Sequence, residues 1–212
     1  MTGDKRPNRR DQARKTRRAI IDAARTEFMD GGYHGATIAS IARRAGVAPQ
    51  TIYFVFHTKA ELVSAVIDDA VLGPDDPTVP QQSEWWAEVV AAPTAGAALE
   101  HFIRGAAPLL DRAAEVSEIV RAAALTDDEV RDVYGYHADL QERAYRGVID
   151  IVITKGELRD GFTAEIATDA LLTLCGDAIW VQLRKERGWP LDRTVGWLVD
   201  TVPAALLAQP SR

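Results

Sequence analysis

Residues 37–59 read TIASIARRAGVAPQTIYFVFHTK, and this stretch predicts a helix-turn-helix. Thr37 can cap a short helix whose apolar residues recur at helical spacing, and Gly46 can form the tight turn that ends it. Pro49 suits the first turn of a second helix, because the N–H that it lacks would have no partner there. The inner side of this second helix is apolar, so its outer side is left free to contact a partner molecule.

The flanking residues also show helical periodicity. A first helix is expected from Gln12 to a glycine pair at 31–32, and the residues from Thr58 fit the capping box of a helix after the motif. Pro108 is expected to kink or split its helix. Further helices are expected over residues 84–92, 95–110, 113–125, 128–154, 163–187 and 192–207. No stretch shows the alternation of a strand, so the sequence predicts an all-α protein.

Charge is divided unevenly along the chain. The 212 residues are 47% hydrophobic and 26% charged, with a net charge of −6, which is typical of a globular protein. Residues 1–67 contain 12 basic and 6 acidic side chains, whereas residues 68–212 contain 13 basic and 25 acidic ones. A basic head on an acidic body favours binding of a polyanion by the head. The basic residues near the N-terminus can contact DNA or can form a solvated tail.

Spaced residues of the motif carry a family resemblance. They are Gly32-Tyr33, Thr37, Ile41-Ala42, Ala45-Gly46-Val47, Thr51-Ile52-Tyr53, Phe56 and Lys59. In these positions residues 12–67 resemble the TetR family of transcriptional regulators. The resemblance implies an N-terminal three-helix DNA-binding domain, a larger C-terminal domain for ligand binding and dimerisation, and a homodimer. We therefore expect a flexible basic arm over residues 1–11, a helix-turn-helix domain over 12–58 and the C-terminal domain over 59–212.

The second helix of the motif is expected to enter the major groove of double-stranded DNA. Gln50 can pair with adenine through its amide, and Thr51 can contact a thymine methyl or a phosphate. Phe54 can touch a thymine methyl or simply pack. The resemblance implies that Tyr53 reaches the DNA backbone, although an aromatic residue at this position can also belong to the core.

Polar residues around this helix complete the predicted DNA contacts. Lys59, near a helix N-terminus, is a candidate phosphate anchor. Thr37 and Arg44 are candidates for contacts with the DNA backbone, and Thr37 can equally serve as a helix cap. His57 can be a DNA contact or a surface histidine. The predicted DNA-binding residues are therefore Thr37, Arg44, Gln50, Thr51, Tyr53, Phe54, His57 and Lys59.

In the C-terminal part, aromatic and polar residues predict a pocket for a small-molecule effector. Phe102, Tyr134, His137, Asp177 and Trp180 lie on segments that would surround a pocket between the helices of the family. Aromatic side chains also fill cores, and a histidine such as His137 is often satisfied by a neighbour. The acidic, aromatic body would suit a cationic or aromatic compound, and the sequence does not name it.

The last two long helices are apolar on more than one side, so their apolar residues can supply both a core stripe and a seam between two copies of the chain. A two-fold pair is what a palindromic operator requires, because its half-sites lie about one helical turn of DNA apart. The predicted interface residues are Leu171, Leu174, Ala178, Val181, Trp197, Leu198, Val202 and Ala205.

The sequence argues against several other classes of protein. It contains no nucleophile elbow, phosphate-binding loop or zinc-binding helix motif, so no catalytic residue, metal or cofactor is expected. A single cysteine cannot form an intramolecular disulfide, and the apolar runs are shorter than the roughly 20 residues of a membrane span. We expect a cytoplasmic, ligand-responsive repressor with no membrane partner. The alternatives are a helical small-molecule-binding protein and a DNA-binding protein without inducer control.

Overall fold

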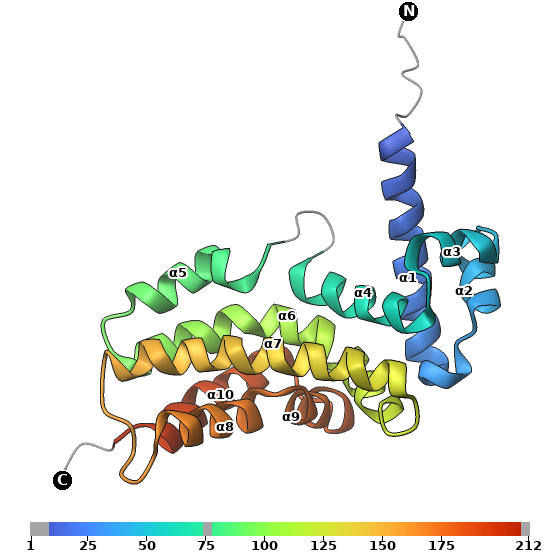
Figure 1. Cartoon of the computed structure of the whole chain (residues 1–212). Helices are drawn as coiled ribbons and strands as arrows, with labels where there is room; N and C mark the ends of the chain where they lie inside the picture. The colour runs from blue at the N-terminus through green and yellow to red at the C-terminus, as the bar shows by residue number, and fades with distance from the viewer. Residues whose placement is uncertain (1–8, 74–77, 209–212) are drawn as a thin grey trace, which may run out of the picture.

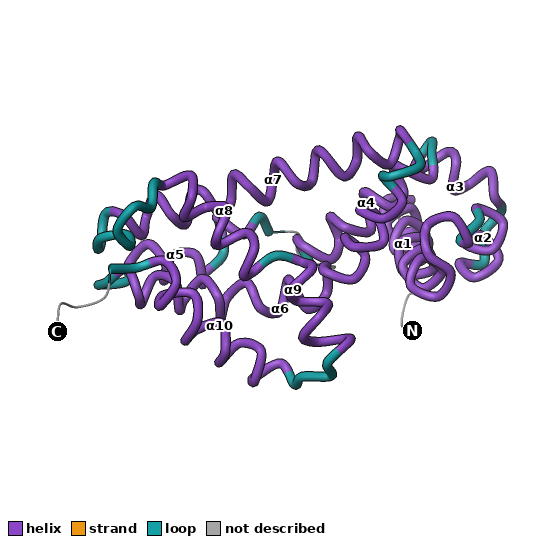
Figure 2. The backbone as a smooth tube through the Cα atoms, turned by 90° about the horizontal axis from the view of Figure 1, so that it is seen from below, coloured by secondary structure: helices purple, strands orange, loops and turns teal. Residues whose placement is uncertain are grey.

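The computed structural model describes residues 9–73 and 78–208, and within these ranges the chain is helical (Figure 2). Its only β-type pairing there is an isolated bridge between Leu158 and Leu207. The helices are α1 (Arg9–Gly35), α2 (Ile38–Ala45), α3 (Pro49–Phe56), α4 (Lys59–Leu72), α5 (Glu84–Ala91), α6 (Ala95–Ala123), α7 (Asp128–Ile153), α8 (Ala164–Cys175), α9 (Asp177–Val181) and α10 (Leu191–Leu206). A short 3₁₀ turn precedes α5, and a π-helical turn follows α9. The all-α prediction is confirmed.

Three helices form a head at one end of the molecule (Figure 1). In the turn between α2 and α3, Gly46 adopts the left-handed conformation with φ 69°, as the predicted tight turn requires. Ile41 of α2 and Ile52 of α3 are both buried against α1 residues such as Phe28. Packing of these apolar sides fixes the two helices relative to each other, and the predicted helix-turn-helix is confirmed.

The start of α1 differs from the prediction. The helix begins at Arg9 rather than at Gln12, so residues 9–11 of the expected flexible arm are helical. The rest of that arm, residues 1–8, lies outside the described residues. At the other end the predicted stop is close, because Gly32 leaves helical geometry with φ 67° and ψ 178°.

The head and the body share apolar core across α4. Leu62 and Val66 of α4 are fully buried between the head helices and the C-terminal half of α6, where Val116 and Val120 belong to the same cluster. Thr58 caps α4 by accepting a hydrogen bond from the Glu61 N–H at 3.0 Å. The expected domain boundary between residues 58 and 59 therefore does not separate two hydrophobic cores, because one core includes residues from both sides of it.

The body is built around α6 and α7, which run side by side along its length (Figure 1). α5 covers one side of this pair, and α8, α9 and α10 cover the other. α6 is one helix, whereas two helices separated near residue 111 were expected. Pro108 is exposed, so its ring faces solvent, while Ala107 and Leu110 beside it are buried. Burial of the apolar side of α6 outweighs the single hydrogen bond that proline removes.

The helix expected over residues 163–187 is divided at Gly176, where the backbone is extended with φ −78° and ψ 169°. At the break, the Tyr145 hydroxyl donates a hydrogen bond to the Cys175 carbonyl oxygen at 2.9 Å. A tertiary partner thus replaces a bond of the helix and ends α8. The Cys175 thiol is buried, and burial raises its pKa to about 12.

Part of the body is apolar enough to meet a simple membrane-span criterion. Among the described residues, Ala164–Glu186 satisfies it by length and composition, with a mean hydropathy of 1.3. One such stretch is a weak indication, because core helices pass the same test. Here the stretch is interrupted at Gly176, and Leu171 and Trp180 within it pack into the core of the body. Only 28% of its most apolar window is buried within the chain.

Candidate nucleic-acid interface and effector cavity

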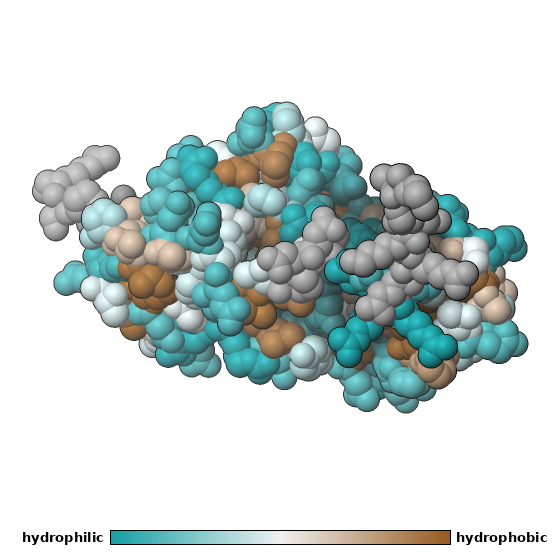
Figure 3. All heavy atoms as spheres, turned by 90° about the horizontal axis from the view of Figure 1, so that it is seen from above, coloured by the Kyte–Doolittle hydropathy of each residue, from teal (hydrophilic) through white to brown (hydrophobic). Residues whose placement is uncertain are grey.

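The outer side of α3 presents the residues predicted to read DNA. Gln50 is exposed, Tyr53 is 52% exposed and Phe54 is 83% exposed, whereas Thr51 is half-buried. Ile52 on the inner side is buried, so the alternative placement of Tyr53 in the core is wrong. The end of the molecule that carries α1–α3 is mainly hydrophilic, with smaller apolar areas (Figure 3). An exposed aromatic pair on a short helix of this kind can contact bases and phosphates.

The residues around α3 are held by contacts within the head. Thr37 caps α2 in a capping box with Ser40, in which the Thr37 Oγ1 accepts from the Ser40 N–H at 3.0 Å. Arg44 donates from Nε to Glu27 at 2.7 Å and also approaches Asp30, which ties α2 to α1. Both side chains therefore have structural roles, and their contacts with DNA stay predictions.

Lys59 differs from its predicted role as a phosphate anchor. Its ammonium donates to the backbone oxygens of Tyr33 at 2.9 Å and Ala36 at 3.1 Å, and it lies 4.0 Å from the centre of the Tyr33 ring. Partial burial lowers the pKa of Lys59, and the charge of Asp127 acts in the opposite direction. An ammonium engaged in this way holds the start of α4 against the connection between α1 and α2, which corrects the expectation of a direct phosphate contact.

The basic N-terminal segment is partly engaged too. Arg18 forms ion pairs with Asp22 at 2.6 Å and with Asp69 of α4, and Arg25 approaches the same Asp69 at 3.2 Å. The guanidinium of Arg17 lies 4.7 Å from the centre of the Phe56 ring. These contacts join α1 to α3 and α4, so a displacement of α4 would also affect the helices of the head.

His57 links α3 to α4 in a strained conformation. It has φ 53° and ψ −53°, and the Thr58 N–H donates to the Phe56 carbonyl oxygen at 2.5 Å. This is a γ-turn with positive φ, a rare arrangement for a residue with a Cβ. The side chain is exposed, in agreement with either a DNA contact or a surface histidine.

Replacing His57 by glycine is expected to raise the free energy of unfolding by roughly 1 kcal/mol, because glycine adopts positive φ without steric strain. Urea unfolding followed by circular dichroism measures the change. His57→Ala is the control, since alanine retains the Cβ and should leave stability close to that of the wild type. Equal stability of the glycine and alanine variants would show that the turn is not strained.

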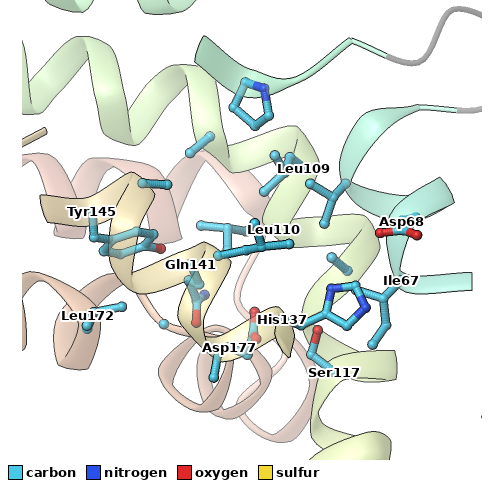
Figure 4. Close-up of a pocket in the computed structure, with 18 of the residues that line it drawn as sticks. Ile67, Asp68, Leu109, Leu110, Ser117, His137, Gln141, Tyr145, Leu172 and Asp177 are labelled. Carbon is cyan, nitrogen blue, oxygen red and sulfur yellow. The ribbon is translucent and has the colours of Figure 1, made fainter. Parts of the chain in front are cut away.

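A cavity of about 790 Å³ lies in the body. Its wall is formed by α4, by α5 and the turn before it, and by α6, α7, α8 and α9 (Figure 4). Ile67 and Asp68 of α4 belong to the wall, so the cavity reaches the helix that follows the head. Its size is in the range of pockets that hold drug-sized molecules.

The structure brings four of the five predicted effector-binding residues to this wall. They are Phe102, Tyr134, His137 and Asp177. Trp180 is not among the wall residues: it is buried in the core, and its indole N–H donates to Asp111 at 3.4 Å. The prediction of Trp180 as a pocket residue is therefore corrected, and the binding role of the other four stays a prediction.

Sequence reasoning missed several aromatic residues of the wall. Trp85 and Trp86 come from α5, and Tyr145 comes from the middle of α7. The centres of the Trp85 and Phe102 rings are 6.4 Å apart, and those of Phe102 and Tyr145 are 5.2 Å apart. The adjacent tryptophans at the start of a short helix were the signal in the sequence. Two large aromatic side chains on so short a helix indicate that the helix packs against other helices of the body.

Titratable groups gather at one end of the cavity (Figure 4). Asp177 is half-buried at the wall, and its carboxyl accepts a hydrogen bond from Ser117. Desolvation of this carboxyl, together with the charge of Glu118, raises the pKa of Asp177 to about 7. His137 Nε2 lies 3.0 Å from the Ser64 hydroxyl of α4, so His137 joins α7 to α4. Desolvation lowers the pKa of His137, and the charge of Asp68 acts against this shift.

The residues predicted for the dimer interface fall into two groups. Leu171, Leu198 and Val202 are fully buried in the core of the body, so they are not free to contact a second copy, and their prediction is corrected. The others are exposed or half-buried at the surface of α8, α9 and α10: Leu174, Ala178, Val181, Trp197 and Ala205. Within the described residues no cluster of three metal-ligating side chains is found.

Comparison with known proteins identifies a family that the head resembles. Residues 20–66 match the model for bacterial regulatory proteins of the tetR family. This segment, which contains α2 and α3, is therefore similar to the DNA-binding domain of the TetR family. The HTH-type transcriptional regulator TtgR of Pseudomonas putida is 44% identical over 59 residues, which are 28% of this chain and 28% of that protein. The chain thus matches little more than a quarter of the length of this relative.

Longer similarities cover the body as well. The HTH-type transcriptional repressor BepR of Brucella suis biovar 1 (strain 1330) is 26% identical over 203 residues, 93% of this chain and 94% of that protein. The crystal structure of the regulator FadR of Bacillus subtilis in complex with stearoyl-CoA has a TM-score of 0.68 and 18% identity, covering 88% of this chain and 97% of that one. The matched family model and these relatives are described as transcriptional regulators.

Proposed function

We propose that this regulator is a repressor that binds a palindromic operator in double-stranded DNA as a homodimer and is released by a small-molecule inducer. The observation that carries the proposal is the cavity wall contributed by α4, because α4 also shares its core with the DNA-binding head. A ligand in the cavity thereby touches the helix that positions α3. The relative named a repressor and the relative holding stearoyl-CoA support both halves of the proposal.

The homodimer is supported by apolar surface on α8 to α10. The stretch Ala164–Glu186 is apolar, yet little of its most apolar window is buried within the chain. Trp197 and Val181 are half-buried, so each has surface left to cover. Burial of such surface between two copies would stabilise a symmetric pair and hold two α3 helices at a fixed separation. Successive major grooves, about 34 Å apart, demand such a separation.

The release step follows from the contacts of α4. On the head side, Asp69 is bound to arginines of α1. On the body side, Ser64 is hydrogen-bonded to His137, and Arg112 of α6 donates to the Ala70 carbonyl oxygen at 3.0 Å. A ligand that favours a different position of α4 would shift the head with it. Its effect on DNA affinity equals its differential affinity for the two arrangements.

Fluorescence anisotropy with labelled genomic fragments tests the DNA-binding half at about 0.1 M salt, where non-specific binding is weak but measurable. One or more fragments with dyad symmetry are expected to bind at least about 10³-fold more tightly than bulk DNA. Size-exclusion chromatography with light scattering tests the dimer. Equal affinity for every fragment, or a strictly monomeric protein, would contradict the proposal. The cavity already counts against a purely architectural DNA-binding protein.

Two substitutions on α3 are expected to act differently. Tyr53→Phe removes a hydroxyl from the exposed side and should weaken binding to all fragments by about 10-fold, as the loss of one phosphate contact does. Gln50→Ala should instead remove preference at one base pair, by roughly 1–3 kcal/mol. Anisotropy titrations on an operator and its single-base variants separate the two results.

Tyr136→Phe is the matched control, because Tyr136 is 56% exposed on α7 and loses the same hydroxyl. It is expected to bind DNA like the wild type. If Tyr53→Phe and Gln50→Ala also bound every fragment like the wild type, the residue roles assigned to α3 would be wrong.

A further inference from the structure

We infer that the effector is an organic cation with an aromatic or apolar body, and that the carboxylate of Asp177 is its counter-charge. The inference rests on the proposed function, in that the cavity is taken as the effector site. It goes further because it assigns the chemical class of the effector and the residue that selects it.

The charges of the cavity wall are the first argument. The wall contains the guanidinium of Arg121, but this group is paired with the carboxylate of Glu118 at 2.6 Å. Asp68 has His137 and Arg17 as positive or titratable neighbours. Asp177 has none: its neighbours are the Ser117 hydroxyl and the negative Glu118. In the described part of the chain, Asp177 takes part in no ion pair.

A desolvated carboxylate without a cation is costly, and its place in the fold does not explain it. Asp177 lies in the first turn of α9, where a carboxylate is favourable, but this helix has only five residues and its start cannot replace a cation as a partner. The residue is held at this position by the break at Gly176, which turns the chain toward the cavity wall. A positive charge in the cavity would supply the missing partner.

Aromatic rings are the second argument. Trp85, Phe102 and Tyr145 form a continuous array of tilted and edge-to-face rings along the wall. Faces of aromatic rings attract cations, and their area accepts an apolar body. The Tyr145 hydroxyl is already engaged by the Cys175 carbonyl oxygen. Phe102 and Tyr145 are buried, so their rings support the half-buried Trp85, whose ring is more accessible. Apolar surface, rings and one carboxylate together fit a hydrophobic ammonium compound.

Three probes that share one naphthyl ring system test the class of ligand. They are the trimethyl(2-naphthylmethyl)ammonium cation, the neutral 2-naphthylmethanol and the 2-naphthylacetate anion. Isothermal titration calorimetry with the full chain at pH 8 is expected to show the cation binding at least about 10-fold more tightly than the alcohol, with the anion weakest. The inference is overturned if the alcohol or the anion binds as tightly as the cation, or if the cation does not bind.

Asp177→Asn tests the residue. The variant is expected to lose at least about 10-fold in affinity for the cation and to bind the alcohol within about 2-fold of the wild type. Asp169→Asn is the matched control, because Asp169 is exposed on α8 and should leave both affinities unchanged. Asn should be tolerated, since a carboxyl whose pKa is raised by folding destabilises the folded chain when it is ionised at pH 8. Unchanged cation affinity in Asp177→Asn would refute the assignment.

The pH dependence of the wild type provides a measurement that needs no variant. The probe carries a permanent charge, so only the protein titrates. With a pKa of about 7, the Asp177 carboxyl is mostly ionised at pH 8 and mostly protonated at pH 6, and cation affinity is expected to fall by about 10-fold between them.

The groups that interact with Asp177 are Glu118 and Ser117 of α6 and Tyr145 of α7, and the cavity wall also contains Asp68, Arg121 and His137. Desolvation lowers the pKa of His137 and thus favours its neutral form, while the charge of Asp68 acts in the opposite direction. His137→Gln should therefore retain the same dependence on pH. A flat profile for the cation, or an equal slope for the neutral alcohol, would contradict the inference.

Binding without DNA keeps this inference separable from the proposed function. If the neutral alcohol binds as tightly as the cation and releases the operator, induction stands and the cation inference fails. If the cation binds in an Asp177-dependent way but leaves operator affinity unchanged, the inference stands and the inducer proposal fails.

Discussion

Gly176→Ala is expected to lower the free energy of unfolding by about 3 kcal/mol. A Cβ at this position would lie 2.3 Å from the Leu172 carbonyl oxygen and 3.5 Å from its carbonyl carbon. Both atoms are backbone at the end of α8, so the contact cannot be relieved by a change of side-chain rotamer. The last turn of α8 would have to move away from the hydroxyl of Tyr145 that ends it.

Urea or thermal unfolding measures this effect. Gly135→Ala is the matched control, because Gly135 lies inside α7 and a Cβ there meets nothing within 4 Å. Alanine at 135 should raise stability by up to about 1 kcal/mol, since glycine is a poor helix former. If Gly176→Ala were as stable as the wild type, the close approach of Gly176 to the Leu172 carbonyl group would be disproved.

Lys59→Met is expected to cost about 2 kcal/mol of stability and to weaken operator binding as well. Methionine retains the apolar stem but removes the ammonium that bonds to the carbonyl oxygens of Tyr33 and Ala36. These groups hold the start of α4 against the connection between α1 and α2. Without these hydrogen bonds the orientation of α3 is less fixed. DNA binding then includes the entropy cost of ordering α3, which lowers the affinity.

Lys155→Met is a matched control for the second part of this prediction. The Lys155 ammonium also donates to two backbone oxygens, those of Val90 and Ala92, each at 2.8 Å, but it does so at the far end of the body. Chemical unfolding should show a similar loss of stability in both variants. Anisotropy under conditions where both are folded should show weaker operator binding in Lys59→Met alone. Equal DNA binding by the two variants would restrict Lys59 to a general structural role.

The head was largely predictable from sequence because its signals are local. Thr37 caps the helix that it precedes, and Gly46 adopts the positive φ that the turn between α2 and α3 requires. Such signals depend on residues three or four positions apart. Lys59 shows their limit, because its proximity to a helix N-terminus suggested a phosphate contact, whereas carbonyl oxygens more than twenty residues away bind its ammonium.

The body was less predictable because its decisive contacts are between distant segments. Pro108 lies within a continuous helix since its ring faces solvent, and the break at Gly176 depends on a hydroxyl thirty positions earlier in the chain. Apolar periodicity identified Leu171 as a residue that must be covered. It could not tell whether the covering surface belongs to the same chain or to a second copy.

The burial of Cys175 has a practical consequence for measuring the proposed motion. It is the only cysteine in the sequence, and a buried thiol with a pKa of about 12 is scarcely nucleophilic. Maleimide reagents should therefore leave the native protein unlabelled. A cysteine introduced at the exposed Ala48, just before α3, would become the sole attachment point for a spin label. In the proposed homodimer, dipolar spectroscopy on that variant would measure the distance between the two α3 helices, with and without an organic cation.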